Sequence, residues 1–189
     1  MNKSNSLVSC VKHVFVFSAV LMASVALSSC SKSDDESDEL PIKQNTVIID
    51  KEEKPILHAG YTNTSGANDY EFTFFLSKDY TEKVKFLYNK NWHCNKDIDL
   101  TKREERHDGV WYWSIDYHKK YKQIIDTDGQ PKALYGSDEP ILPVFDKGTL
   151  RISDGEGNNI KILLKNGKVV GADNKPHTIT IHYDGPRLK

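Results

Sequence analysis

Cysteine is scarce in this sequence: only three occur among 189 residues, and the chain after residue 44 holds Cys94 alone. A disulfide within that part of the chain is therefore excluded. We expect Cys94 to be a buried, small apolar residue, whereas an exposed thiol would be free to pair with a second chain. The roughly 145 residues from 45 onward suffice for one domain whose core needs neither a disulfide nor a metal.

The sequence also lacks an excess of basic residues, since its formal net charge is −1. Acidic residues gather at positions 34–39, and the chain beyond them is close to neutral. A nucleic-acid-binding domain needs basic side chains concentrated on one face or stripe. We therefore expect no nucleic-acid partner.

Recognisable catalytic motifs are missing as well. The sequence contains no G-x-S-x-G elbow, no phosphate-binding glycine loop and no H-E-x-x-H helix. Acidic pairs such as Asp97 and Asp99 are common in solvated loops, and a glycosidase needs two carboxylates at a defined separation. We expect a protein that is not an enzyme and that has no cofactor.

The amino terminus has an apolar run of 14 residues at 14–27, preceded by Lys3 and Lys12. A membrane-spanning helix needs about 20 residues, so this pattern favours a signal peptide. The run ends in Leu27-Ser28-Ser29-Cys30, which resembles the lipobox of bacterial lipoproteins. The resemblance implies cleavage before Cys30 and acylation of its thiol. The alternatives are an ordinary signal peptide with a chance cysteine, or a buried helix.

Residues 31–39 are short, polar and strongly acidic. They resemble the export signal that follows the lipidated cysteine in surface lipoproteins of the Bacteroidota, and the resemblance assigns that role to Asp34, Asp35 and Glu36. It implies an outer-membrane protein that faces the cell exterior, with a periplasm-facing orientation as the alternative. On physical grounds the segment is a self-repelling linker that cannot pack.

The predicted organisation is a signal peptide at 1–29, a lipidated and flexible tether at 30–44, and one β domain at 45–189. Acyl chains on Cys30 would hold the protein on the membrane. Apolar residues of the domain recur at every second position, the pattern of half-buried strands. The predicted strands lie near residues 70–77, 83–89, 111–117, 150–152, 160–164 and 179–183.

Turn residues separate these strands. Asn166-Gly167 predicts a tight hairpin, residues 154–159 predict a loop, and residues 126–129 predict a turn. Residues 97–106 are the one plausible short helix. We expect an all-β fold with at most one short helix, either an antiparallel β-sandwich or a small, partly open barrel. Residues 148–185 are also similar to the closing strands of small β lipoproteins of the same bacterial group, which implies a β fold.

Two constellations suggest metal binding. His93, Cys94, His107 and His118 are residue types that ligate zinc, but their spacing is not that of structural sites, which favours isolated surface histidines and a buried thiol. Residues 126–129 (Asp-Thr-Asp-Gly) begin like a calcium loop but do not continue as one, so a plain turn is favoured. We expect no metal.

Aromatic residues are concentrated between positions 92 and 121. Alternation places Trp111, Trp113, Ile115 and Tyr117 on one face, as a core requires, and leaves Trp92 and Tyr112 as the candidate ligand-binding residues. We expect a binding domain for a glycan or a host protein. The alternative is an accessory subunit docked on an outer-membrane assembly.

Overall fold

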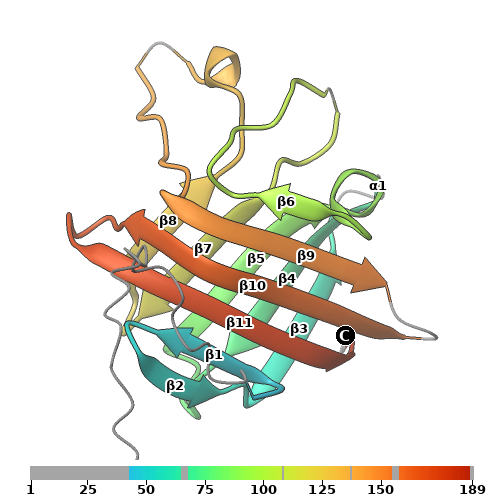
Figure 1. Cartoon of the computed structure of the whole chain (residues 1–189), viewed down its shortest axis with the longest axis vertical. Coiled ribbons are helices and arrows are strands. Elements are labelled where there is room, and N and C mark those ends of the chain that lie inside the picture. The colour runs from blue at the N-terminus through green and yellow to red at the C-terminus, as the bar shows by residue number, and fades with distance from the viewer. Residues whose placement is uncertain (1–42, 65–67, 108, 137, 155–157, 188–189) are drawn as a thin grey trace, which may run out of the picture. The chain divides into compact units, whose positions relative to one another are not determined.

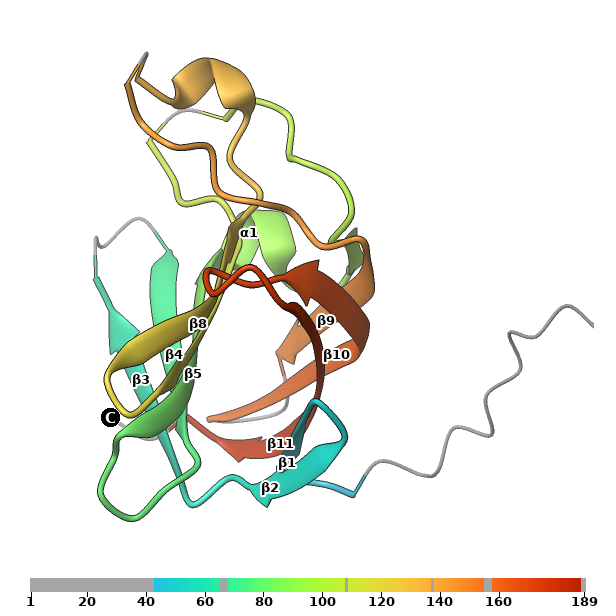
Figure 2. The same cartoon turned by 90° about the vertical axis from the view of Figure 1, so that its left-hand side faces the viewer.

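The computed structural model describes residues 43–64, 68–107, 109–136, 138–154 and 158–187. Cys30, Asp34, Asp35 and Glu36 lie outside these residues. The described chain forms two antiparallel β-sheets that face each other across one core (Figure 1, Figure 2). No helix in the described part of the chain is long and apolar enough to cross a membrane.

The first sheet has six strands in the order β2-β1-β11-β10-β9-β6. Their bounds are Thr46–Ile49 (β1), Glu52–Pro55 (β2), Asp97–Asp99 (β6), Lys147–Asp154 (β9), Asn159–Val170 (β10) and Pro176–Pro186 (β11). The second sheet has five strands in the order β3-β4-β5-β7-β8. Their bounds are His58–Asn63 (β3), Asp69–Phe75 (β4), Glu82–Asn89 (β5), Ser114–Lys119 (β7) and Lys122–Asp128 (β8). Two short helical segments, α1 (Lys90–His93) and the 3-10 turn η1 (Lys132–Leu134), complete the fold.

The core lies between the inner faces of the two sheets. Its largest fully buried side chains come from both sheets and from the connections that follow β6 and β8: Trp113, Tyr88, Phe72, Phe74, Phe86, Phe145, Leu100, Ile115, Ile125, Leu150, Ile152 and Ile160. Alternation along each strand produces this arrangement, because every second side chain points inward. The expected antiparallel β architecture is confirmed, and the barrel is not closed.

The predicted Asn166-Gly167 hairpin is wrong, because β10 continues through both residues. A bulge at this point shifts the register with both neighbouring strands. Asn166 has the positive φ, of 53°. Position 167 needs glycine for another reason, because there is no room for a side chain. A Cβ at Gly167 would lie 2.8 Å from the carbonyl oxygen of Ile179 on β11.

Two other local predictions are also wrong. Residues 97–106 form β6 and an irregular loop in place of a helix, since Asp99 bonds the backbone N–H of Thr101 (3.1 Å) to close a turn. Asp126 to Asp128 continue β8, so the turn predicted at 126–129 does not form there. Gly129 is required because the Trp113 ring packs against it, and a Cβ would lie 2.2 Å from the indole Nε1.

The predicted aromatic strand begins later than expected. β7 starts at Ser114, and Ile115 and Tyr117 point into the core as alternation requires. Trp113, just before the strand, is fully buried. Trp111 lies outside the strand and is half-buried, with its backbone N–H bonded to the Asp69 carboxylate (2.9 Å). It is therefore a border residue and not the core residue that the pattern predicted.

Candidate functional site

Two long connections lie at the same end of the sandwich (Figure 1, top). Their described residues are 100–107 and 109–113 after β6, and 129–136 and 138–146 after β8. Connections longer than about 12 residues are uncommon in compact domains, and many of them are functional. Helix α1 lies beside them (Figure 2). We call this region the loop end.

The two connections are tied together by Arg103. Its guanidinium donates to the carbonyl oxygens of Gln130 (2.8 Å) and Leu142, and it lies 3.4 Å from the Asp128 carboxylate. Asp128 in turn accepts a hydrogen bond from the Tyr135 hydroxyl (2.6 Å). Because planar guanidinium contacts fix several carbonyls at once, the loop end is held in one arrangement.

Helix α1 is a single turn, and its cap explains where it starts. The side-chain oxygen of Asn89 accepts hydrogen bonds from the backbone N–H groups of Asn91 (2.9 Å) and Trp92 (3.2 Å). The turn leaves Trp92 44% exposed and buries His93. Of these two adjacent side chains, that of Trp92 therefore reaches solvent and that of His93 points into the protein.

Glu104 is the centre of a buried hydrogen-bond network. Its Oε2 lies 2.8 Å from Nε2 of His93 and 3.0 Å from Nε2 of His107, and its Oε1 accepts from the Trp113 backbone N–H (2.7 Å). Burial raises the pKa of this carboxyl, but the hydrogen bonds and the charge from His93, the Trp113 N–H and His107 outweigh it. The net pKa is lowered, so Glu104 is held as a carboxylate.

The ligand atoms of His93, Glu104 and His107 lie within 4.8 Å of one another, a spacing compatible with a metal ion. The hydrogen bonds of His93 do not fit this use. Its Nδ1 accepts the backbone N–H of Asn89 (2.7 Å), so a neutral His93 must carry its proton on Nε2, the atom that faces Glu104. Since a metal needs that lone pair, the donor set suits a hydrogen-bond network and not a metal centre.

The ring of His107 is stacked between two aromatic rings. Its centroid lies 4.6 Å from that of Trp92, with 18° between the planes, and 4.1 Å from that of Tyr112, with 26°. The Tyr112 hydroxyl accepts the His107 backbone N–H (3.1 Å) and donates to the His107 carbonyl (3.0 Å). Glu104 thus orients the middle ring of a three-ring stack whose outer member, Trp92, reaches solvent.

A cavity of about 210 Å³ adjoins this network. His93, Glu104 and Trp113 contribute to its wall. The other lining residues are mostly charged: Lys96, Asp97, Ile98, Asp99, Lys102 and Arg103. Neighbouring carboxylates and cations offer both acceptors and donors, which suits a neutral ligand rich in hydroxyl groups.

The structure places both candidate ligand-binding residues, Trp92 and Tyr112, against His107. The interpretation of His93 and His107 as isolated surface residues is wrong, because both are buried and both meet Glu104. Sequence reasoning missed Glu104, which it assigned to a helix. Glu104 precedes His107 by three positions, and this spacing is the one feature of the sequence that could have indicated their contact.

The remaining zinc candidates take no part in this network. His118 lies on β7, where burial and the charges of Lys83 and Lys85 lower its pKa. Cys94 is half-buried, and burial raises the pKa of its thiol to about 11. The candidate calcium residues also separate, since Asp128 bonds Tyr135 while Asp126 lies opposite Asp116 on the neighbouring strand.

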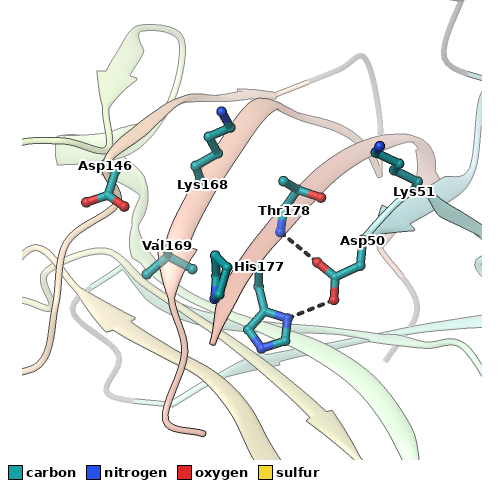
Figure 3. Close-up of a pocket in the computed structure, with 8 residues that line it drawn as sticks. Asp50, Lys51, Asp146, Lys168, Val169, His177 and Thr178 are labelled. Atoms are coloured by element: carbon teal, nitrogen blue, oxygen red, sulfur yellow. Dashed lines mark hydrogen bonds and ion pairs between the residues drawn. The ribbon is translucent and has the colours of Figure 1, made fainter. Parts of the chain in front are cut away.

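A second cavity, of about 410 Å³, lies at the turn between β1 and β2 (Figure 3). His177 in its wall is wedged between two carboxylates, with Nδ1 2.7 Å from Asp50 and Nε2 3.0 Å from Asp173. Asp50 also accepts the Thr178 backbone N–H (2.8 Å). These bonds hold Asp50 and Lys51 in the left-handed conformation, with φ of 51° and 70°. Sequence reasoning did not single out this cluster.

No protein-family model, curated protein or solved structure matches this chain. The functional interpretation therefore depends on the residues of the site.

Proposed function

We propose that this protein is a lipid-anchored binding protein of the outer-membrane surface, and that its loop end recognises a glycan. The observation that carries the proposal is the stack of Trp92, His107 and Tyr112. Flat aromatic rings pack against the apolar faces of sugars, while adjacent charged groups bond the hydroxyls. Trp92 is exposed, and Nζ of the cavity-lining Lys96 lies 5.8 Å from the centroid of the Trp92 ring, so a sugar that contacts Trp92 is close to those groups.

The rigidity of the loop end supports binding. Ordering of loops and side chains upon association costs free energy, and a site that is already fixed avoids this cost. Arg103 and Glu104 fix the loops through contacts inside the protein. Neither residue needs a ligand to complete its hydrogen bonds, so the site is preorganised.

The chemistry of the loop end supports a non-catalytic role. A general acid or base needs a pKa close to the working pH, whereas the Glu104 pKa is lowered and its carboxylate accepts three N–H groups. A nucleophilic cysteine needs a lowered pKa, whereas burial raises that of Cys94.

A glycan array probed with the full chain tests the proposal. A hit should be lost or weakened at least tenfold in Trp92→Ala, with the melting temperature nearly unchanged. Tyr121→Ala is the matched control, because Tyr121 is an exposed aromatic residue at the far turn between β7 and β8. A hit that Trp92→Ala leaves unchanged would move the ligand away from this site. Binding to host proteins but to no glycan would reassign the ligand class.

The anchor is tested separately. Cys30→Ser should abolish incorporation of labelled palmitate while the domain still folds, and palmitate on the variant would contradict acylation at Cys30. Joint replacement of Asp34, Asp35 and Glu36 by Ala should keep the anchor but protect the domain from protease added to intact cells. Equal cleavage of both proteins would contradict the export role.

The accessory-subunit alternative requires a broad apolar surface for docking. The exposed large apolar side chains of the described residues are Leu57, Tyr80, Trp92, Tyr121, Ile141 and Val170. Three of them, Leu57, Tyr80 and Tyr121, lie at the end of the second sheet opposite the loop end, where Tyr80 packs on Phe75 and the backbone N–H of Lys120 bonds the carbonyl of Thr81. A docked partner would therefore use that end, and Tyr121→Ala reports on it.

A further inference from the structure

The sheets end in four outer strands, β2, β6, β3 and β8, and an outer strand can pair with a further strand unless something prevents it. Two of them carry the usual protections. β2 has the sequence Glu-Glu-Lys-Pro, and β6 has three residues of which two are aspartates. Charge, proline and short length all disfavour pairing.

The outer side of β8 is occupied by the chain itself. The backbone N–H of Ala172 donates to the carbonyl oxygen of Ile124 (2.9 Å), and that of Asp128 donates to the carbonyl of Pro143 (3.3 Å). A bulge between Tyr117 and His118 also disturbs the register of β7 with β8. β8 is therefore closed to a further strand.

β3 has none of these protections. Its six residues, His-Ala-Gly-Tyr-Thr-Asn, include no proline and no acidic, lysine or arginine side chain, and they pair with β4 without a break in register. The described residues place no strand on its outer side (Figure 2). The backbone N–H of Thr64 bonds the Asp69 carbonyl (3.2 Å), and backbone groups of successive residues in a strand face opposite sides, so those of Thr62 and Gly60 also face β4. The backbone groups of Ala59 and Tyr61 therefore point away from β4.

We propose that β3 is a self-association edge, where two copies of this chain pair antiparallel about a two-fold axis through Gly60. Ala59 of each copy then exchanges backbone hydrogen bonds with Tyr61 of the other, and the two five-stranded sheets become one. Gly60 faces Gly60 of the second copy in a pair without hydrogen bonds, where strands approach most closely.

The side chains of β3 make a second copy the suitable occupant. On the face of the sheet that covers the core, the large Tyr61 of each copy lies opposite the small Ala59 of the other, so this contact occurs twice. On the outer face, Thr62 meets His58, so a polar residue meets a polar residue. An edge strand with a fixed charge would repel its own copy, whereas the side chains of β3 carry none, and the Arg187 guanidinium near the Tyr61 ring is paired with Asp154.

Gly60 gives a sharp test because the single copy has room for a side chain there. A Cβ at Gly60 would lie 3.7 Å from Phe75 Cε2 and 3.9 Å from the Thr73 carbonyl, which is ordinary contact. A charged residue at this position should therefore leave each copy folded. In the dimer, the same charge would face itself across the axis.

The experiment is sedimentation velocity on the full chain in detergent over a concentration series. We expect a monomer–dimer equilibrium for the wild type, and dissociation constants raised about two- to fivefold in Gly60→Lys and in Gly60→Asp. An equal mixture of the two variants should dimerise again, because opposite charges then face each other. Thr149→Lys, an exposed residue of the inner strand β9, is the control and should dimerise like the wild type.

Three results would overturn the proposal. These are a wild type that is monomeric at every concentration, a dimer that Gly60→Lys leaves unchanged, and a mixture of the two charged variants that stays monomeric while circular dichroism shows both folded. None of these results depends on the glycan site, which lies at the loop end.

Discussion

Glu104 and His177 occupy inverse arrangements of the same two chemical groups. At the loop end, one carboxylate lies between two imidazoles, those of His93 and His107. Beside the turn between β1 and β2, one imidazole lies between two carboxylates, those of Asp50 and Asp173. In the first cluster each ring needs only one N–H, on the Nε2 that faces Glu104, whereas in the second the single ring must be protonated at both nitrogens to serve both partners.

The inversion has consequences for pH. The lowered pKa of Glu104 makes its cluster strongest when the carboxyl is ionised. Burial lowers the pKa of His177, but the hydrogen bonds and charges of Asp50 and Asp173 outweigh it and the net pKa is raised. Acid should therefore weaken the first cluster, and base should weaken the second.

The largest expected effect is that of Glu104→Ala. The change leaves the ring N–H groups of His93 and His107 and the backbone N–H of Trp113 buried without an acceptor. We expect a loss of about 3 to 5 kcal/mol in the free energy of unfolding, measured by urea denaturation at pH 7. Glu105→Ala, at the exposed neighbouring residue, should have little effect.

The pH dependence sharpens this test. The contribution of Glu104 should be fully present above its unfolded pKa near 4.5 and disappear as the pH falls through the lowered folded value. The difference between wild type and Glu104→Ala should therefore narrow in acid. A constant difference down to pH 3 would show that packing, and not charge, accounts for the effect.

His177→Gln should have a smaller effect, of about 1 to 2 kcal/mol at pH 6, because glutamine cannot donate to both carboxylates at once. The raised pKa of His177 means that its stabilisation is complete below the unfolded value near 6.5 and is lost as the pH rises through the folded value. The melting temperatures of the wild type and His177→Gln should differ at pH 6 and become equal at pH 9. An equally large difference at pH 9 would contradict a stabilising protonated ring.

The last prediction concerns two carboxyls with no imidazole between them. Asp116 and Asp126 face each other across β7 and β8, and burial, followed by the charge of Asp126, raises the pKa of Asp116 to about 7. The folded state thus loses stability as the pH rises from about 4 to 7. Asp116→Asn should stabilise the protein at pH 8.5, where the pair is ionised, and leave its stability unchanged at pH 4. Asp138→Asn, at an exposed site, is the control.

Sequence periodicity predicted the strands whose two faces differ most, and it missed those whose residues do not alternate. β4, β5 and β10 show apolar and polar residues in turn. β2 and β6 are short and charged, and pair through their backbones.

Turn-forming residue types did not predict where the hairpins lie. The two-residue connections are Asp50-Lys51 and Lys120-Tyr121, in which both residues have positive φ although neither is glycine. Asn166-Gly167, the standard hairpin pair, forms a bulge. Contacts from other strands decide these conformations, and a local sequence does not contain them.

The candidate site also depends on tertiary contacts that a local sequence does not reveal. Exposed aromatic character pointed to Trp92 and Tyr112, but the ring between them and the carboxylate that orients it could not be found from spacing. His93 and Glu104 are 11 positions apart and meet only because α1 and the loop after β6 are brought to the same end. A network assembled by tertiary structure leaves little periodic trace in the sequence.

The half-buried thiol of Cys94 bears on how the protein can be handled. With a pKa of about 11, only about one thiol in ten thousand is ionised at pH 7, and the thiolate is the species that reacts with alkylating reagents and disulfides. A cysteine engineered onto the exposed surface would react far faster. Cys94 therefore need not be removed before a surface cysteine of the described domain is labelled with a fluorophore or spin label.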